Sequence, residues 1–112
     1  MTKEELRAAW LEALRSGKYK QGKNFLCNRN LEYCCLGVLC EVAGIPKVKE
    51  DDLFSFDYSS ASLPAFLKEK VGLYSSLGNS KDVTPSLSAL NDNGNSFSEI
   101  ADLLETGDYW VE

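Results

Sequence analysis

The sequence predicts a mainly helical α+β domain with about five short helices and a small antiparallel β element. Its 112 residues suit one globular domain, and the 44% of apolar residues are enough to fill one core. In several segments apolar residues recur at helical spacing between a capping residue and a glycine. Shorter apolar runs are separated by turn residues, which is typical of strands. We therefore expect a single domain across residues 1–112.

The first helix is predicted over about residues 3–16. Thr2 and Glu5 have the spacing of a capping box, and Gly17 stops the helix. The apolar residues that repeat on one face are Leu6, Ala9, Trp10, Ala13 and Leu14.

A loop and a hairpin are predicted next. Residues 16–24 are polar and basic, with two glycines and no apolar period, so we expect no regular element there. The turn-like residues 28–30 separate apolar runs at 25–27 and 31–33. This pattern predicts a short β-hairpin.

A second helix is predicted over residues 34–43, where the apolar positions fit a helix that is buried on much of its surface. Gly44 and Pro46 end this helix. Gly37 lies inside it, where glycine costs about 1 kcal/mol relative to alanine. We therefore expect another backbone segment to pack closely against Gly37.

One strand and a third helix follow. Phe54, Phe56 and Tyr58 alternate with polar residues, which predicts a half-buried strand that could pair with the hairpin. Pro64 suits the first turn of a short helix that ends at Gly72.

Residues 73–83 are rich in Ser, Gly and Asn, which predicts a surface loop. Two more helices are expected after it. One begins at the Thr-Pro pair of residues 84–85 and stops at the turn residues 91–94. The other begins at a second capping box, formed by Ser96 and Glu99. The residues expected in the core are Leu6, Trp10, Leu14, Leu36, Leu39, Leu67, Leu90, Ile100 and Leu104.

Charge is unevenly distributed along the chain. Residues 1–50 carry nine Lys or Arg against six acids, whereas residues 51–112 carry three against eleven. Duplex DNA binding is disfavoured, because it needs a continuous basic surface. No apolar run reaches the roughly 18–20 residues that span a bilayer, and the amino end is a charged helix start without a secretory segment. We expect a cytoplasmic protein with no membrane contact.

The cysteines have several interpretations, of which core packing is the one we favour. Cys27, Cys34, Cys35 and Cys40 would form disulfides only in a secreted chain, so we expect them reduced. A catalytic thiol of the papain type needs an imidazole, and the chain has no histidine. Structural zinc prefers C-x2-C pairs, whereas the intervals here are seven, one and five. We expect no catalytic residue, no metal and no cofactor.

Two further patterns also have a structural interpretation. Asp51 with Asp52, or Asp102 with Glu105, could act as general acid and base, but solvated surface acids explain them as well. Residues 96–104 are similar to the first helix of a helix-turn-helix, but no basic recognition helix follows them. We favour an amphipathic core helix.

A basic segment with an aromatic residue is a candidate anion or nucleotide site. Four cations surround Tyr19 between two glycines, so a phosphate could bind there while Tyr19 stacks on a base. The segment lacks both standard glycine-rich phosphate patterns, and a solvated linker is the alternative. The candidate site comprises Arg15, Lys18, Tyr19, Lys20, Lys23 and, through the hairpin, Arg29.

Three ordered motifs carry a family resemblance. They are the runs at residues 10–19 and 33–40, and the Leu-Asn-Asp-Asn-Gly run at 90–94 followed by the Ser-Phe-Ser-Glu-Ile-Ala-Asp run at 96–102. Together they resemble small, largely uncharacterised proteins of tailed phages and prophages over most of the chain. The resemblance implies a phage origin, and small phage accessory proteins commonly act by binding.

We therefore expect a non-enzymatic phage accessory protein that modulates a host process or host defence. It would bind a host protein through its acidic second half, which could also mimic nucleic acid. The alternative is a small-molecule binder, monomeric or homo-oligomeric, that sequesters an anionic nucleotide signal through residues 15–23. A cysteine-dependent enzyme is the third hypothesis.

Overall fold

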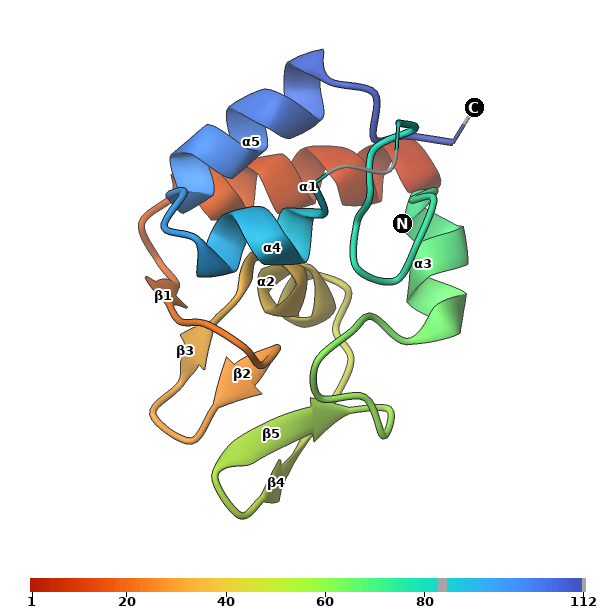
Figure 1. Ribbon diagram of the computed structural model, residues 1–112. Helices are drawn as coiled ribbons and strands as arrows, with labels where there is room; N and C mark the ends of the chain where they lie inside the picture. Colours follow the sequence, from red (N-terminus) through yellow and green to blue (C-terminus); the bar gives the residue numbers. More distant parts are fainter. Residues whose placement is uncertain (83–84, 112) are drawn as a thin grey trace.

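The computed structural model describes residues 1–82 and 85–111, which form five α-helices and one five-stranded mixed sheet. Figure 1 shows α1, α4 and α5 stacked in one layer and the strands gathered below it. The helices are α1 (Lys3–Arg15), α2 (Cys35–Val42), α3 (Ala65–Val71), α4 (Leu87–Asp92) and α5 (Phe97–Thr106). The strands are β1 (Lys20–Gln21), β2 (Cys27–Asn28), β3 (Glu32–Tyr33), β4 (Lys47–Glu50) and β5 (Leu53–Phe56). The predicted α+β class is confirmed.

Both predicted capping boxes form. The Thr2 hydroxyl accepts the Glu5 backbone N–H at 3.1 Å, and the Glu5 carboxylate accepts the Thr2 N–H at 2.8 Å. Ser96 and Glu99 make the same pair of bonds at 3.1 and 2.8 Å. Each box satisfies N–H groups that the first helical turn leaves without a partner. None of the helices in residues 1–82 and 85–111 is long and apolar enough to cross a membrane.

Helix α1 is the centre of the helical layer and packs against α2, α3 and α5. Trp10 is fully buried at this junction, and its indole N–H donates to the Cys35 carbonyl at 3.0 Å. The buried face of α5 packs here too, so residues 96–104 form the amphipathic core helix that we favoured.

Helix α4 corrects two predictions. It begins at Leu87, after Ser86 as its cap, and not at residues 84–85, of which Thr84 lies outside the described residues. Leu90 is only half-buried, because Leu87 and Asn91, one helical turn apart, occupy the inner face of α4. The other eight residues expected in the core are buried.

The helical layer and the sheet meet at Gly37 of α2. A Cβ atom at this position would lie 1.7 Å from the carbonyl oxygen of Leu26, which immediately precedes β2. The predicted close approach of another backbone is therefore confirmed.

The strand order in the sheet is β1-β3-β2-β5-β4. The predicted hairpin is present as the antiparallel pair β2 and β3, and β5 pairs with β2. Two strands were not predicted. Strand β1 pairs in parallel with β3 inside the segment that we expected to be a loop, and β4 pairs with β5 as an edge strand.

The strand predicted through Tyr58 ends at Phe56 instead. Reciprocal backbone hydrogen bonds of 2.7 and 3.0 Å between Phe56 and Ser59 close a two-residue turn. Asp57 and Tyr58 occupy this turn with φ angles of 51° and 67°, which no extended strand can accommodate.

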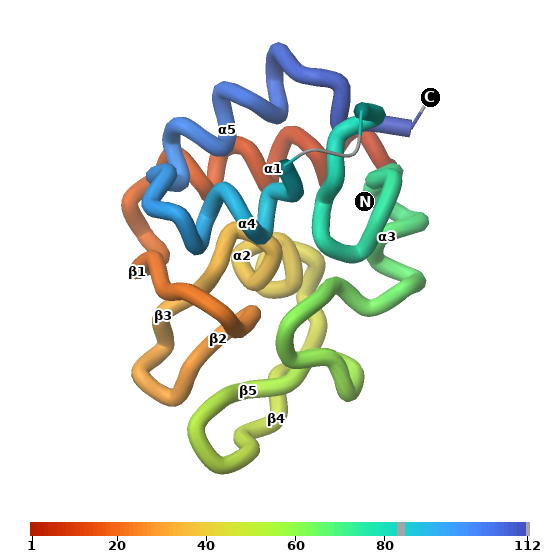
Figure 2. Tube along the Cα trace, in the orientation of Figure 1, coloured from red at the N-terminus to blue at the C-terminus, as the bar shows by residue number. Residues whose placement is uncertain are grey.

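The residues after α5 fold back onto the helices. The Trp110 ring packs edge-on against Trp10 at 6.0 Å between centroids, and its N–H donates to the Leu104 carbonyl at 3.0 Å. The Arg7 guanidinium lies 4.4 Å from the centre of the Trp110 ring and donates to the Val111 carbonyl at 3.2 Å. This tail therefore runs beside the first turns of α1 (Figure 2).

Candidate functional site

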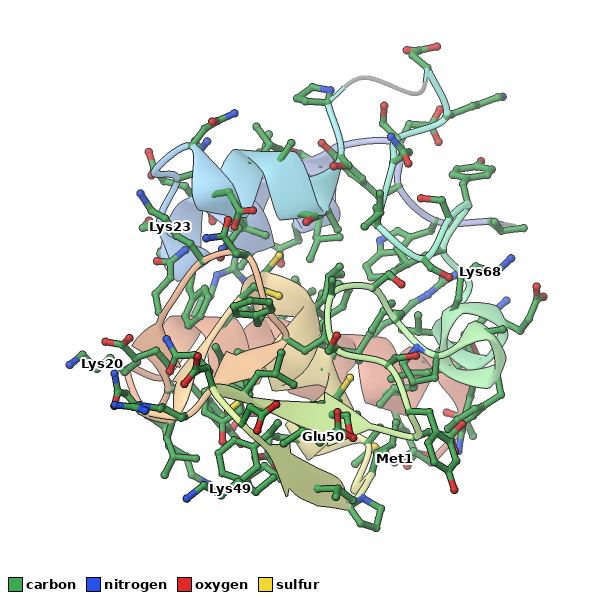
Figure 3. The ribbon with its side chains drawn as sticks, turned by 60° about the horizontal axis from the view of Figure 1, so that its bottom comes forward. Met1, Lys20, Lys23, Lys49, Glu50 and Lys68 are labelled. Atoms are coloured by element: carbon green, nitrogen blue, oxygen red, sulfur yellow. The ribbon has the colours of Figure 1, made fainter. Side chains whose placement is uncertain are left out.

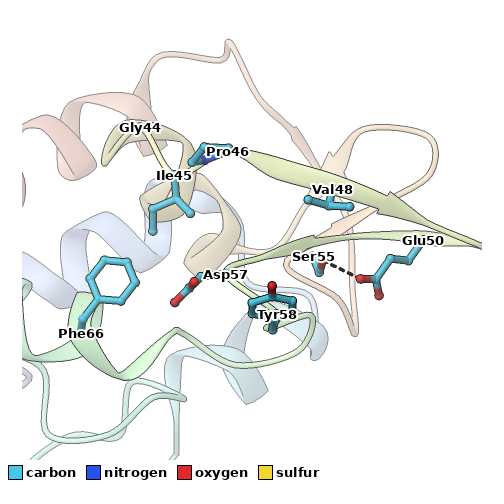
Figure 4. Close-up of a pocket in the computed structure, with 9 residues that line it drawn as sticks. All are labelled: Gly44, Ile45, Pro46, Val48, Glu50, Ser55, Asp57, Tyr58 and Phe66. Atoms are coloured by element: carbon cyan, nitrogen blue, oxygen red, sulfur yellow. Dashed lines mark hydrogen bonds between the residues drawn. The ribbon is translucent and has the colours of Figure 1, made fainter.

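The β4-β5 hairpin and helix α3 border an open hollow of about 580 Å³, which we call the β4-α3 groove (Figure 4). Its size lies within the range of roughly 300–1,000 Å³ that is typical of ligand sites. The lining comes from the segment that follows α2, both strands of the hairpin, the turn after β5, and α3. It consists of Gly44, Ile45, Pro46, Val48, Glu50, Ser55, Asp57, Tyr58 and Phe66.

Alternation along β4 gives its two faces different chemistry. Val48 and Glu50 line the groove, so Lys47 and Lys49 belong to the opposite face. There the Lys47 ammonium donates to the Glu41 carboxylate of α2 at 2.8 Å. The Lys-Val-Lys-Glu sequence of β4 thus supplies the groove with one apolar and one acidic side chain.

Three large side chains around the groove are exposed to solvent. The exposed fractions are 57% for Val48, 96% for Tyr58 and 52% for Phe66. Complete burial of an apolar side chain of this size is worth about 1.5–3 kcal/mol, and here much of that stabilisation is not realised. Exposed apolar groups that gather around a hollow are typical of an interaction site.

The turn after β5 fixes the backbone position of Tyr58 at the edge of the groove. Asp57 and Tyr58 both have left-handed φ angles, a conformation that costs a non-glycine residue about 1–2 kcal/mol. Strain of this kind tends to occur at functional positions. Asp57 and Tyr58 are therefore presented on a defined turn and not on an extended strand.

The charged groups of the groove are both acidic. The Glu50 carboxylate accepts a hydrogen bond from the Ser55 hydroxyl at 2.9 Å, and Asp57 lies on the other side of Tyr58 (Figure 4). No Lys or Arg is among the lining residues, and neither carboxylate has an ion-pair partner within residues 1–82 and 85–111. The groove therefore suits an apolar group that lies next to a cation.

Residues 2–108 match the model of a protein family described as a domain of unknown function (DUF8296). The chain belongs to this family. No curated protein and no solved structure matches the chain. All the residues that line the β4-α3 groove lie within the DUF8296 domain.

Three of the six residues predicted to bind an anion form ion pairs in the DUF8296 domain. Arg15 bonds to Asp102 at 2.7 Å and also to a second carboxylate of α5, that of Glu105, at 2.8 Å. The remaining pairs join Lys20 to Glu32 and Arg29 to Asp52, each at 3.3 Å. These carboxylates compete with any external anion for the same cations.

Lys18 and Tyr19 are neighbours in the sequence, and their side chains lie close together. The Lys18 ammonium lies 5.4 Å from the centre of the Tyr19 ring, and both residues line a second hollow of about 270 Å³. Glu12 also lines it, whereas Arg15, Lys20, Lys23 and Arg29 do not. Figure 3 shows Lys20 and Lys23 pointing outward at separate places. Anion binding by the six residues together stays a prediction.

The four cysteines of the DUF8296 domain are free and buried, as the core interpretation expects. Cys34 lies at the start of α2, where burial raises the pKa of its thiol to about 11. The backbone N–H groups of Gly37 and Leu36 lower this pKa, but by less than burial raises it. A protonated thiol is the less reactive form. No group of three or more His, Cys, Asp or Glu side chains in the described part of the chain is placed to hold a metal ion.

We expect the DUF8296 domain to lose stability in alkali. The unfolded chain releases the Cys34 proton near the ordinary thiol pKa of about 8.5, whereas the folded chain retains it up to about pH 11. The folded state then binds more protons, so the contribution of Cys34 to the free energy of unfolding is constant below about pH 8.5 and falls as the pH rises toward 11. Urea unfolding at a series of pH values measures this fall.

The control for this prediction is Cys34→Ser, which removes the thiol but keeps the size of the side chain. Its stability should fall less steeply with pH than that of the natural sequence. Equal slopes in the two proteins would show that Cys34 is not responsible.

Sequence reasoning missed the β4-α3 groove. Its lining is dispersed over residues 44–66, and no motif joins them. The available signal was the alternation of Lys47, Val48, Lys49 and Glu50 directly after Pro46, which is typical of an exposed edge strand.

Proposed function

We propose that this DUF8296 domain acts without catalysis, by binding a partner protein in the β4-α3 groove. The observation that carries the proposal is the groove itself, an open apolar hollow that is surrounded by exposed Val48, Tyr58 and Phe66. An open groove with an exposed edge strand is the form that protein-peptide recognition commonly uses.

The phage resemblance supplies the context of the proposal. We propose that the partner is a protein of the host cell, bound in its cytoplasm, and that binding modulates a host process or host defence. Of the acidic residues in the second half, Asp57 lies at the groove, and Glu50, the last residue of the first half, adds a second acid there. Part of the remaining acidic surface, at Asp102 and Glu105, is already paired with Arg15.

Photo-crosslinking tests this proposal. Position 58 receives p-benzoylphenylalanine in place of Tyr58, which is 96% exposed and lies at the groove. We expect a specific protein adduct in cells of the host, which mass spectrometry then identifies. The same photo-reactive residue at Ser98, which is exposed on α5 in the helical layer, should not give this adduct.

Substitutions at the groove test whether the adduct forms because a protein docks in the groove. Val48→Asp and Phe66→Ser change exposed residues, so the fold should persist while the adduct is lost. Leu77→Ser, at an exposed apolar residue outside the groove, should keep the adduct. The proposal is refuted if the adduct still forms in both groove variants. It is also refuted if the photo-reactive residue at position 58 labels only the proteins that are labelled from position 98.

A further inference from the structure

Strand β4 has an open outer edge next to the groove. Within residues 1–82 and 85–111 only β5 pairs with it, and the turn at Asp51-Asp52 closes the hairpin so that Glu50 is opposite Leu53. The pair that closes a two-residue turn, here Glu50 and Leu53, is hydrogen-bonded. Because hydrogen-bonded and non-bonded pairs alternate along an antiparallel ladder, Lys49 and Lys47 are in non-bonded pairs, and their peptide groups point away from β5. Their free N–H and C=O groups are a template for another strand.

We propose that the partner docks as an extended segment that adds a strand to the outer edge of β4. This inference rests on the proposed function and specifies the form of the partner. The added backbone bonds to the free peptide groups of Lys47 and Lys49, and every second side chain of the segment lies on the groove side. The side chain opposite Val48 is apolar and enters the hollow.

Charges along β4 specify the neighbouring positions of the segment. Glu50 is two residues from Val48 on the same face and has no ion-pair partner among the described residues, so a basic residue fits opposite it. Asp57 adds to the negative charge of that face. On the other face, an acidic residue fits opposite Lys49. The segment therefore carries apolar, acidic and basic residues at three consecutive positions.

A second copy of this chain is a poorer occupant of the edge. Two β4 strands can pair antiparallel over more than one residue, with Val48 still on the groove face, in two registers. In these registers Val48 lies opposite either Val48 or Glu50 of the copy. The first register places Lys47 opposite Lys49, and the second places Lys49 opposite Lys49. Like charges directly opposite one another destabilise a strand pair. Edge lysines thus favour a partner of complementary charge.

Peptide selection followed by a pair of variants tests this inference. Random decapeptides displayed on yeast are selected on the full chain, and synthetic versions are measured by fluorescence anisotropy. The matched variants are Lys49→Ala and Lys49→Pro, which both remove the charge, but only proline removes the outward N–H. Proline is tolerated on an edge strand whose N–H faces solvent.

We expect selection of the apolar-acidic-basic triplet, in this order for a parallel segment and in reverse for an antiparallel one. We expect affinity at least tenfold weaker for Lys49→Pro than for Lys49→Ala. Glu50→Lys, which leaves the backbone untouched, should replace the basic preference by an acidic one. Peptides without the triplet, or equal binding to the two Lys49 variants, would overturn the inference. Light scattering gives a further test. If the protein is a dimer and Val48→Asp dissociates it, the occupant of the edge is a second copy, and the inference is overturned.

The outcomes separate this inference from the proposed function. If the adduct at position 58 persists in Lys49→Pro, a protein does dock in the groove, but not as an added strand. If no protein adduct forms at all, the proposed function itself fails.

Discussion

Replacing Gly37 by alanine is expected to destabilise the protein by about 3 kcal/mol or more. The new Cβ would lie 1.7 Å from the Leu26 carbonyl oxygen and 2.6 Å from its carbon, so the backbones of α2 and of the segment before β2 must separate. Both segments belong to the core, where no empty space can absorb the movement. Urea unfolding followed by tryptophan fluorescence measures the loss.

Gly17→Ala is the matched control for this prediction. Gly17 has a left-handed φ of 75°, but no atom lies within 4 Å of a Cβ built on it. Only conformational strain remains there, at a cost of about 1 kcal/mol. If the two substitutions destabilise the protein equally, close backbone packing at Gly37 is not what requires glycine.

Asn91→Ala is the second substitution with a large expected effect, also about 3 kcal/mol. The Asn91 amide group is buried and donates to the Gly22 carbonyl at 2.8 Å. Its oxygen accepts from the Gln21 side chain at 2.8 Å and from the Cys35 N–H at 3.2 Å. Alanine leaves these buried groups unsatisfied, and α4 loses its polar link to β1 and α2.

Asn95→Ala provides the comparison, because the half-buried Asn95 side chain donates one hydrogen bond, to the Leu90 carbonyl at 3.0 Å. We expect a cost of about 1 kcal/mol there. Asn91→Asp should be as harmful as Asn91→Ala, because an oxygen would then face the Gly22 carbonyl. A stable Asn91→Asp protein would contradict the role assigned to the Asn91 amide group.

Local signals explain why most helices could be predicted. A capping box needs residues only three positions apart, so Thr2 with Glu5 and Ser96 with Glu99 specify helix starts without any tertiary contact. Gly37 was informative for a different reason. A glycine inside an apolar helix is unfavourable by itself, which points to a constraint from another part of the chain.

The unpredicted strands depend on partners that are distant in sequence. Strand β1 has two residues, and its pairing with β3 is its only strand pairing in the described chain. Strand β4 has one apolar residue, Val48, and its pairing with β5 defines it. The turn at Asp57 and Tyr58 lacks the glycine or asparagine that usually marks a left-handed turn, so its aromatic residue was assigned to a strand.

The candidate site was less predictable than the fold. The basic segment around Tyr19 is a plausible anion site in the sequence, but Arg15 is paired with Asp102 and Glu105 of α5, which lie 87 and 90 residues further along the chain. The β4-α3 groove collects residues from five segments, and no pattern in the sequence singles out its apolar members. These apolar side chains indicate a binding site only because they are exposed to solvent, and their exposure is set by the tertiary structure.

The contact of Arg7 and Trp10 with Trp110 affects how the chain folds during synthesis. Trp110, whose ring packs against Trp10 and Arg7, is translated 100 residues after Trp10. Until then part of the apolar face of α1 stays uncovered, and closing so long a stretch of chain is slow. A nascent chain stalled shortly before Trp110 should therefore attract chaperones that bind exposed apolar helices.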